Sequence, residues 1–138
     1  MKDNYILDAC ALIAYFKNET GSEAMVQFFC QADDGDISIF MHKLNLLEVF
    51  YGFYRDDGKE KADAILDDSL LLPIIFVDEL EESLFREAGR LKASHDISFA
   101  DSIALALASV RGGSLITADH HEFEIIENKE TIRFSWIR

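Results

Sequence analysis

Short apolar runs alternate along this chain with longer stretches whose apolar residues recur at helical spacing. The short runs predict β-strands, and the longer amphipathic stretches predict α-helices. Strands are expected at Tyr5–Leu7, Asp36–Phe40, Pro73–Val77, Leu115–Thr117 and Ile132–Ser135. Helices are expected at Ala11–Lys17, Ser22–Ala32, Lys43–Tyr54, Lys59–Leu70, Glu79–Ser94 and Ser98–Arg111.

The same spacing predicts which side of each element is buried. The β-branched run Pro73–Val77 is suited to a fully buried strand. Gly112 and Gly113 are expected to end the helix of small residues that precedes them. Inward faces are expected at Leu44, Leu47, Phe50, Tyr51 and Tyr54 of one helix, and at Leu80, Leu84, Ala88 and Leu91 of another.

Strands that alternate with helices predict a mainly parallel sheet covered on both faces. The expected fold is therefore a three-layer α/β/α arrangement with four or five strands. The chain of 138 residues has one proline, Pro73, and shows neither a linker nor an internal repeat, so residues 1–138 are interpreted as a single domain. In such folds ligands bind beyond the carboxyl ends of the strands, where strand order reverses.

The composition of the chain argues against some classes of binding partner. The formal net charge of −13 argues against broad electrostatic attraction to nucleic acid or to an anionic membrane, although an enzyme acting on nucleic acid needs only a local patch. Cys10 and Cys30 lie in apolar segments, have no CxxC spacing and are expected to be buried free thiols. The start, Met1–Asn4, does not resemble a signal peptide, and no run approaches the ~18 apolar residues of a membrane helix. A cytoplasmic protein without a membrane partner is expected.

Four acidic residues stand next to or inside apolar runs. Asp8 and Asp119 close predicted strands, whereas Glu48 and Asp101 interrupt the apolar stretches of predicted helices. Each strand-end aspartate could be a turn residue or a helix cap, and a single buried acid could pair with Lys or Arg. Burying carboxylates is costly unless a cation neutralises them, and no basic residue stands beside any of the four. Hard oxygen ligands of this kind suit Mg²⁺ or Mn²⁺.

Other polar and aromatic groups have simpler interpretations. His120 and His121 are expected in a polar loop after a strand, because adjacent residues do not face the same way. Arg86 and Arg90 are expected on a solvated, salt-bridged helix face with nearby glutamates. Asp56 and Asp57 before Gly58 predict a helix-ending turn. The aromatic group Phe50, Tyr51, Phe53 and Tyr54 could stack bases, but is more typical of a core, a dimer interface or a partner surface.

The four acids lie in short motifs that follow one another in a characteristic order: Ile6–Ile13, Leu47–Gly52, Ser98–Ala106, and Leu115–Asp119 followed by Phe123. This ordered set resembles the PIN-domain family of ribonucleases, most closely the toxin branch of bacterial toxin–antitoxin pairs. The likeness spans nearly the whole chain. One departure is Cys10, where many relatives carry a small polar residue that makes a supporting hydrogen bond.

The resemblance implies Mg²⁺- or Mn²⁺-dependent hydrolysis of RNA. It implies that Asp8 and Asp101 are the firmest metal ligands, that Glu48 positions water or a second ion, and that Asp119 completes the cluster directly or through water. Thr117 is a candidate hydrogen-bond donor behind these ligands. The implied partners are an RNA substrate, an antitoxin protein and a second copy of the chain.

Other enzymes with an aspartate after the first strand fit less well. Phosphatases of the haloacid dehalogenase type need D-x-D-x-T, but Cys10 holds the place of the second acid. Receiver domains need a lysine after a later strand, and none follows Leu115–Thr117. The loops GxxxxGK[ST] and GxGxxG are absent from the sequence. The alternative from another class is a non-catalytic PIN-fold interaction module, which would be expected to have lost one or more of the four acids.

Overall fold

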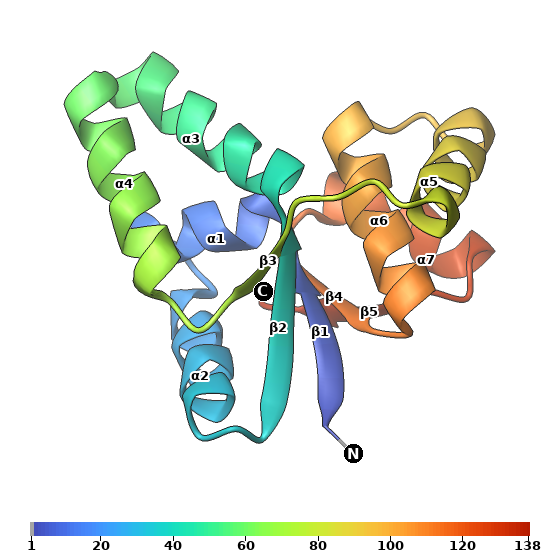
Figure 1. Ribbon diagram of the computed structural model, residues 1–138, viewed down its shortest axis with the longest axis horizontal. Coiled ribbons are helices and arrows are strands. Elements are labelled where there is room, and N and C mark those ends of the chain that lie inside the picture. The colour runs from blue at the N-terminus through green and yellow to red at the C-terminus, as the bar shows by residue number, and fades with distance from the viewer. Residues whose placement is uncertain (1) are drawn as a thin grey trace.

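The computed structural model describes residues 2–138, so Met1 of the Met1–Asn4 start lies outside the described residues. Five strands form one sheet in the order β3-β2-β1-β4-β5, and every neighbouring pair is parallel (Figure 1). The strands are β1 Asp3–Leu7, β2 Ile37–His42, β3 Ile75–Val77, β4 Ser114–Thr117 and β5 Arg133–Trp136. The predicted parallel sheet within a three-layer α/β/α fold is confirmed.

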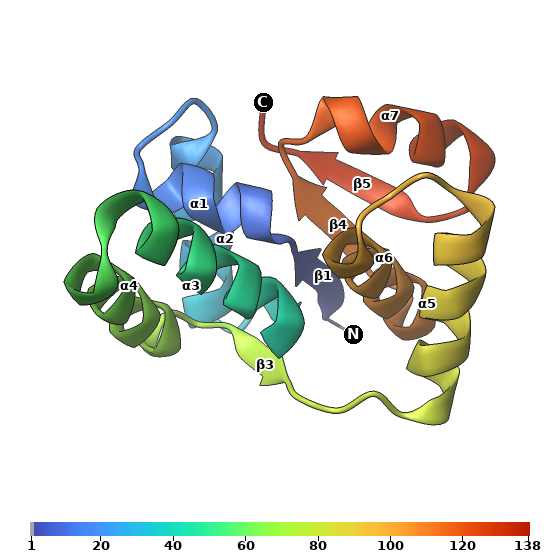
Figure 2. The same ribbon diagram turned by 90° about the horizontal axis from the view of Figure 1, so that it is seen from above.

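Two groups of helices cover the two faces of the sheet (Figures 1 and 2). Their bounds are α1 Ala9–Phe16, α2 Ser22–Asp33, α3 Lys43–Asp57, α4 Lys59–Leu71, α5 Glu82–Ser94, α6 Phe99–Arg111 and α7 His120–Lys129. Buried residues of α1 to α4 form one core cluster, and buried residues of α5 to α7 form the other. Neighbouring residues of β1 serve opposite faces, because Leu7 belongs to the first cluster and Ile6 to the second. None of the described helices is long and apolar enough to cross a bilayer.

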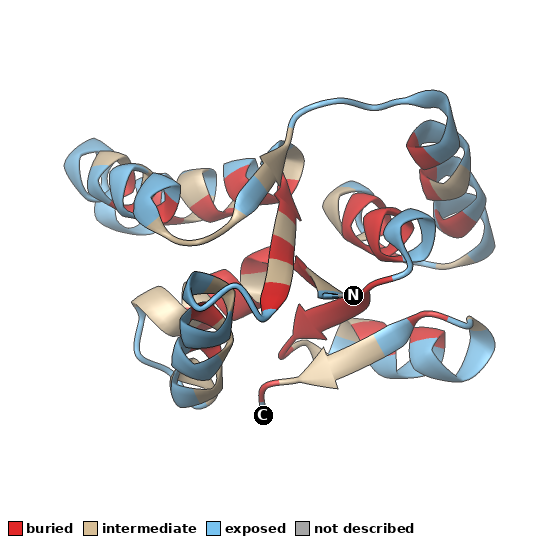
Figure 3. Cartoon of the chain, turned by 60° about the horizontal axis from the view of Figure 1, so that its bottom comes forward, coloured by how far each residue is buried: buried red, intermediate tan, exposed pale blue. Residues whose placement is uncertain are grey.

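Helix α6 is the most deeply buried helix, as its red ribbon in Figure 3 shows. Every residue from Ser102 to Ala108 is buried. The alternating alanines let this helix lie close to β1, β2 and β4, since small side chains permit a short distance between backbones. Gly112 ends the helix in the left-handed conformation that the Gly112-Gly113 pair predicted.

The predicted burial of Pro73–Val77 is wrong. Strand β3 has three residues, lies at the edge of the sheet and leaves Ile75 half exposed. Pro73 lacks a backbone N–H and cannot extend the ladder, which is why proline favours edge strands. The predicted burial of Leu80 is wrong because α5 begins at Glu82, so Leu80 lies in the connection before the helix. The predicted burial of Cys30 is also wrong, because this residue of α2 is exposed.

The predicted inward face of α3 is also largely wrong. Leu47, Tyr51 and Tyr54 are each about half exposed. The buried residues of the helix are instead Asn45, Leu46, Val49 and Phe53. Apolar residues surround most of this helix, so their spacing was compatible with either face. The polar Asn45 also lies on this buried face, where its side-chain N–H donates to Ala100 O at 2.9 Å and its carbonyl oxygen has no hydrogen-bond partner among the described residues.

Helix α7 replaces the polar loop predicted around His120 and His121. Only Phe123 and Ile126 of this helix are buried, which gave too few apolar positions to reveal a helical period. Asp119 caps the helix, because its carboxylate accepts a hydrogen bond of 3.1 Å from Glu122 N–H. The predicted chain order of the remaining elements is confirmed, with boundary shifts of a few residues.

Candidate active site

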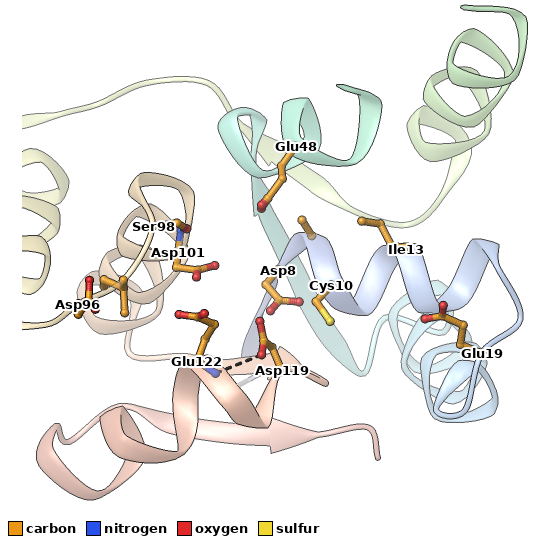
Figure 4. A pocket seen from close by; sticks show the side chains of 12 residues that line it. Asp8, Cys10, Ile13, Glu19, Glu48, Asp96, Ser98, Asp101, Asp119 and Glu122 are labelled. Atoms are coloured by element: carbon orange, nitrogen blue, oxygen red, sulfur yellow. Dashed lines mark hydrogen bonds between the residues drawn. The ribbon is translucent and has the colours of Figure 1, made fainter. Parts of the chain in front are cut away.

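An open cavity of about 600 Å³ lies where β1 and β4 end, between the two helical layers (Figure 4). Acidic side chains from both layers reach it: Asp8, Glu19, Glu48, Asp96, Asp101, Asp119 and Glu122. Its lining, drawn from residues 2–138, includes no Lys, Arg or His. The structure therefore gathers all four acids singled out in the sequence, together with three others, of which Glu19 at the rim pairs with Arg138 at 3.5 Å.

Asp8 connects the first strand to the first helix and is almost completely buried, with 2% of its surface exposed. One carboxylate oxygen accepts a hydrogen bond of 2.8 Å from Ala11 N–H and so caps α1. The other accepts a hydrogen bond from the hydroxyl of Thr117. Burial raises the pKa of Asp8 to about 7, the two donors oppose this shift, and the charges of Asp101 and Asp119 add to it.

Thr117 joins two of the acids. It is the last residue of β4, and none of its surface is exposed. While its hydroxyl donates to Asp8, the same oxygen accepts a hydrogen bond of 3.1 Å from Asp119 N–H. The parallel pairing of β1 with β4 brings these residues together, because Leu7 is in register with Ile116. The hydroxyl therefore fixes one orientation of the Asp8 carboxylate.

Asp101 lies in the first turn of α6. Ser98 caps this helix by accepting a hydrogen bond of 3.0 Å from Asp101 N–H. Burial is the main cause that raises the pKa of Asp101 to about 6; the Ser98 hydrogen bond lowers it, and the charges of Glu48, Asp119 and Glu122 raise it further. The carboxyl group points into the cavity (Figure 4).

Glu48 enters the cavity from α3, on the opposite side from Asp101 (Figure 4). It is half-buried, and burial followed by the charge of Asp119 raises its pKa. The start of α3 is held against the start of α6 by the hydrogen bond from the Asn45 amide to Ala100 O. One turn of α3 separates Asn45 from Glu48, so this bond sets how far Glu48 lies from Asp101.

The donor set fits a hard divalent cation. Clustered carboxylates with raised pKa values and no positive neighbour are stabilised by such an ion. Within residues 2–138, no three Asp, Glu, His or Cys side chains are placed so that they could hold a metal ion together. An ion in the cavity would therefore need water to complete its coordination, as Mg²⁺ often does, because it usually keeps several waters and takes only one or two carboxylates from the protein. Cys10 also borders the cavity, but burial raises the pKa of its thiol to about 12, which leaves it protonated and a poor metal ligand.

Three acids of the cavity were missed in the sequence: Glu19, Asp96 and Glu122. Glu122 carried a usable signal, because an Asp followed three residues later by a Glu has the spacing of a helix capping box. Asp96 and Glu19 lie in connections between helices, where no periodic pattern marks a side chain as inward. Their place in the cavity follows from the tertiary fold alone.

The histidines and arginines lie outside the cavity lining. The ring of His120 stacks on Trp136 with centroids 4.0 Å apart, and its Nε2 lies 2.6 Å from Arg138 O. His121 is exposed. Arg86 pairs with Glu82 at 2.9 Å and Arg90 with Glu87 at 2.7 Å, which confirms the salt-bridged face predicted for α5.

Several solved structures of similar fold come from toxin–antitoxin systems. A chain of the DNA-bound VapBC from Salmonella typhimurium superposes with a TM-score of 0.76 and 17% identity, over 100% of both chains. A chain of VapBC2 from Rickettsia felis, bound to a DNA fragment from its promoter, gives a TM-score of 0.73 at 19% identity, over 96% of this chain and 97% of that one. VapC20 from Mycobacterium tuberculosis, a toxin that cleaves the sarcin–ricin loop, gives 0.65 at 12% identity, over 88% and 94%.

These identities establish a shared fold. No curated protein sequence gave a significant match. The family model of the PIN domain matches residues 5–129, which include all four acids singled out in the sequence. The chain therefore belongs to the PIN-domain family.

Proposed function

We propose that this protein is a Mg²⁺- or Mn²⁺-dependent ribonuclease and the toxin of a toxin–antitoxin pair. The observation that carries the proposal is the cavity at the carboxyl edge of the sheet, which seven acidic residues line without a Lys, Arg or His in the lining. Such a set of carboxylates destabilises the metal-free protein by mutual repulsion. A bound divalent ion would neutralise this repulsion.

In this proposal Asp8 and Asp101 hold the ion directly, and Asp119 supports it directly or through water. A divalent ion bound there would polarise the phosphoryl group and lower the pKa of a bound water. Thr117 keeps the Asp8 carboxylate in one orientation by its hydrogen bond. Ser98 fixes the first turn of α6, from which Asp101 projects.

Glu48 is proposed to orient the attacking water and accept its proton. Its raised pKa makes it a better proton acceptor than an ordinary glutamate, since general bases work best with a pKa near the working pH. The water oxygen bonds to phosphorus, the bond from phosphorus to the 3′-oxygen breaks, and the departing oxygen takes a proton from solvent. The products carry a 5′-phosphate and a 3′-hydroxyl.

The antitoxin part of the proposal is supported by the fold shared with chains of VapBC structures and by the charge of the cavity. An antitoxin would place Arg or Lys among the carboxylates, where its charge replaces that of the ion. An apolar helix of the antitoxin, or a second copy of this chain, would cover the exposed side chains Leu47, Tyr51 and Tyr54 of α3.

The test is cleavage of RNA by the purified chain with Mg²⁺, with Mn²⁺ and with EDTA. Cleavage should require the ion and leave 5′-phosphate ends. Asp67→Asn is the matched control, because Asp67 is an exposed acid on α4 that does not line the cavity. Full activity in EDTA, or cyclic phosphate ends, would contradict the mechanism. A chain that bound a partner but never cleaved RNA would be an interaction module.

A further inference from the structure

A second pocket, of about 390 Å³, lies beside the acidic cavity, between α7 and the connection from α5 to α6. The pocket and the cavity have a common wall, because Asp96, Ile97 and Glu122 line both of them. The other residues of the second pocket, which we call the α7 pocket, are Ser94, His95, His121, Ile125, Ile126 and Lys129. A ligand that fills the cavity could therefore continue over this wall into the α7 pocket.

The cavity and the α7 pocket differ in charge. Within residues 2–138 the cavity lining has no Lys, Arg or His, whereas His95, His121 and Lys129 all line the α7 pocket. Neither Lys129 nor His121 forms a salt bridge with any of the described residues. The carboxylate of Glu130, which follows Lys129 in the chain, pairs instead with Arg90 and His95. The positive charge of Lys129 is therefore not neutralised by the fold.

His95 forms a fixed part of the α7 pocket. Its side chain is only 7% exposed, and its Nε2 lies 2.8 Å from Glu130 Oε2. Since a carboxylate only accepts hydrogen bonds, Nε2 carries a proton and the contact fixes the orientation of the ring. The other nitrogen, Nδ1, has no hydrogen-bond partner within residues 2–138. A buried polar atom without a partner in the protein is available to a ligand of the pocket.

These groups suit the phosphate of a nucleotide. Every nucleotide of RNA carries a phosphate, and binding of RNA depends on positive groups that contact its phosphates. The cavity lining offers none, although a divalent ion held there would act on the scissile phosphate itself. In the adjoining pocket Lys129 supplies a positive charge and His121 supplies an imidazole N–H donor. Ile125, which is 59% exposed, adds apolar surface for a ribose or a base.

We propose that the α7 pocket binds the phosphate of a nucleotide next to the cleavage site, so that RNA runs from the cavity over the wall of Asp96 and Glu122 to Lys129. The inference rests on the proposed ribonuclease activity. Lys129 then contributes to substrate binding and takes no part in breaking the bond. Loss of its charge should raise KM and leave kcat nearly unchanged.

Phosphate binding is tested first without cleavage. The chain has four histidines, whose ring signals can be followed by NMR in EDTA at fixed pH as inorganic phosphate is added. The signals of His95 and His121 should shift and reach a plateau, whereas those of His42 and His120, which line neither the cavity nor the α7 pocket, should not move. Potassium chloride at the same ionic strength should not reproduce the shifts. Lys129→Gln should weaken phosphate binding by about 2- to 5-fold.

Cleavage of a single-site RNA oligonucleotide then tests where the pocket lies along the substrate. Lys129→Gln should raise KM by about 2- to 5-fold. It should also reduce the slope of log kcat/KM against log salt by about 0.7, the value for one phosphate contact on a single strand. Lys129→Arg should behave as the wild type does. Lys92→Gln is the matched control, because Lys92 is an exposed lysine of α5 that lines neither the cavity nor the α7 pocket.

Oligonucleotides with one neutral methylphosphonate locate the contact. At one phosphate beside the cleavage site, this change should cost the wild type the same factor as Lys129→Gln, and should cost Lys129→Gln nothing further. Thermal unfolding should show no loss of stability in Lys129→Gln, since this residue forms no salt bridge within residues 2–138.

Four results would overturn the inference while the wild type still cleaves in a metal-dependent way. Phosphate could leave His95 and His121 unshifted, or chloride could shift them equally. Lys129→Gln could cleave as Lys92→Gln does, or no methylphosphonate position could remove the difference between Lys129→Gln and the wild type. If the wild type cleaves no RNA at all, the proposed function and this inference fail together.

Discussion

Two acidic clusters of this protein have opposite surroundings. On the outer side of the α5–α7 layer, Arg90 lies 2.7 Å from Glu87 and 2.8 Å from Glu130, and His95 Nε2 lies 2.8 Å from Glu130. Hydrogen bonds to Arg90 are the main cause that lowers the pKa of both glutamates. In the cavity Asp8 and Asp101 form no salt bridge within residues 2–138, and burial raises the pKa of Asp8 to about 7 and that of Asp101 to about 6.

If the proposed function is correct, this difference in pKa separates acids that stabilise the fold from acids that hold the ion. A carboxylate whose pKa is lowered by folding stabilises the fold above its unfolded pKa, and this stability is lost as pH falls through the folded pKa. A carboxylate whose pKa is raised by folding destabilises the fold at pH values above its unfolded pKa, because the fold favours its protonated form. Glu87 and Glu130 therefore help to hold α5 to the end of α7, whereas Asp8 and Asp101 weaken the metal-free fold near neutral pH.

The largest expected effect is the loss of activity in Asp101→Asn. This substitution keeps the size of the side chain but removes a charge that the metal site needs. A metal ion supplies several kcal/mol of charge stabilisation in the transition state, so kcat/KM should fall by about 10³-fold or more. The metal-free variant should also unfold at a higher temperature than the wild type at pH values above the pKa of Asp101. If the variant cleaves RNA at the wild-type rate, Asp101 is not needed for activity, and its proposed role in holding the ion is wrong.

Thr117→Val should have the next largest effect. Valine has the shape of threonine but cannot donate to Asp8 or accept from Asp119 N–H. Loss of a hydrogen bond behind a metal ligand typically costs about 10- to 100-fold in activity or metal affinity. Thr117→Ser keeps the hydroxyl and should retain most of the activity. Equal losses in the two variants would show that packing of the methyl group, and not the hydrogen bond, matters.

The response to pH and metal tests the cavity without a mutation. In EDTA, Asp8 should make the fold less stable as pH rises from its ordinary pKa of 3.8 toward its folded pKa of about 7. Mg²⁺ should raise the melting temperature most at the upper end of this range, where the carboxylates are ionised. Thermal unfolding with and without Mg²⁺ at several pH values measures this. An Mg²⁺ effect that is constant with pH would argue against binding by these acids.

The smallest of the four effects is expected at the paired cluster. Arg90→Ala leaves Glu87 and Glu130, whose side chains are 19% and 13% exposed, without their main partner. The free energy of unfolding should fall by about 1–2 kcal/mol above pH 5, with nuclease activity unchanged. Arg86→Ala is the control on the same helix, because the Arg86–Glu82 pair is largely exposed and should contribute little. Equal effects from both variants would remove the distinction between the two clusters.

The sequence predicted the parts of the site that depend on local pattern. Asp8 and Asp119 each follow a run of apolar residues, and residues that follow parallel strands collect at one edge of the sheet. Glu48 and Asp101 were conspicuous because a charge within an apolar stretch needs an explanation. These four positions follow from chain pattern and the cost of burying charge.

The remaining features of the fold and the site depend on tertiary packing, which cannot be predicted from the spacing of residues along the chain. Helix α3 has apolar residues on most sides, so only its packing against α1, α4 and α6 decides that Tyr51 and Tyr54 face outward. Helix α7 has two buried residues, and its start is marked by a cap at Asp119 more clearly than by a period. Glu122 was missed with that helix.

The hydrogen bond between Thr117 and Asp8 joins residues 109 positions apart. Its consequence concerns synthesis of the protein on the ribosome. A nascent chain that ends at Gly112 already contains Asp8, Glu48 and Asp101, yet it lacks β4, which carries Thr117 and leads to Asp119. The proposed ion site cannot be completed until β4 and Asp119 have also emerged, because domains generally fold as units. If the proposed toxicity is correct, the cell has the full time of translation to supply an inhibitor before the first active molecule exists.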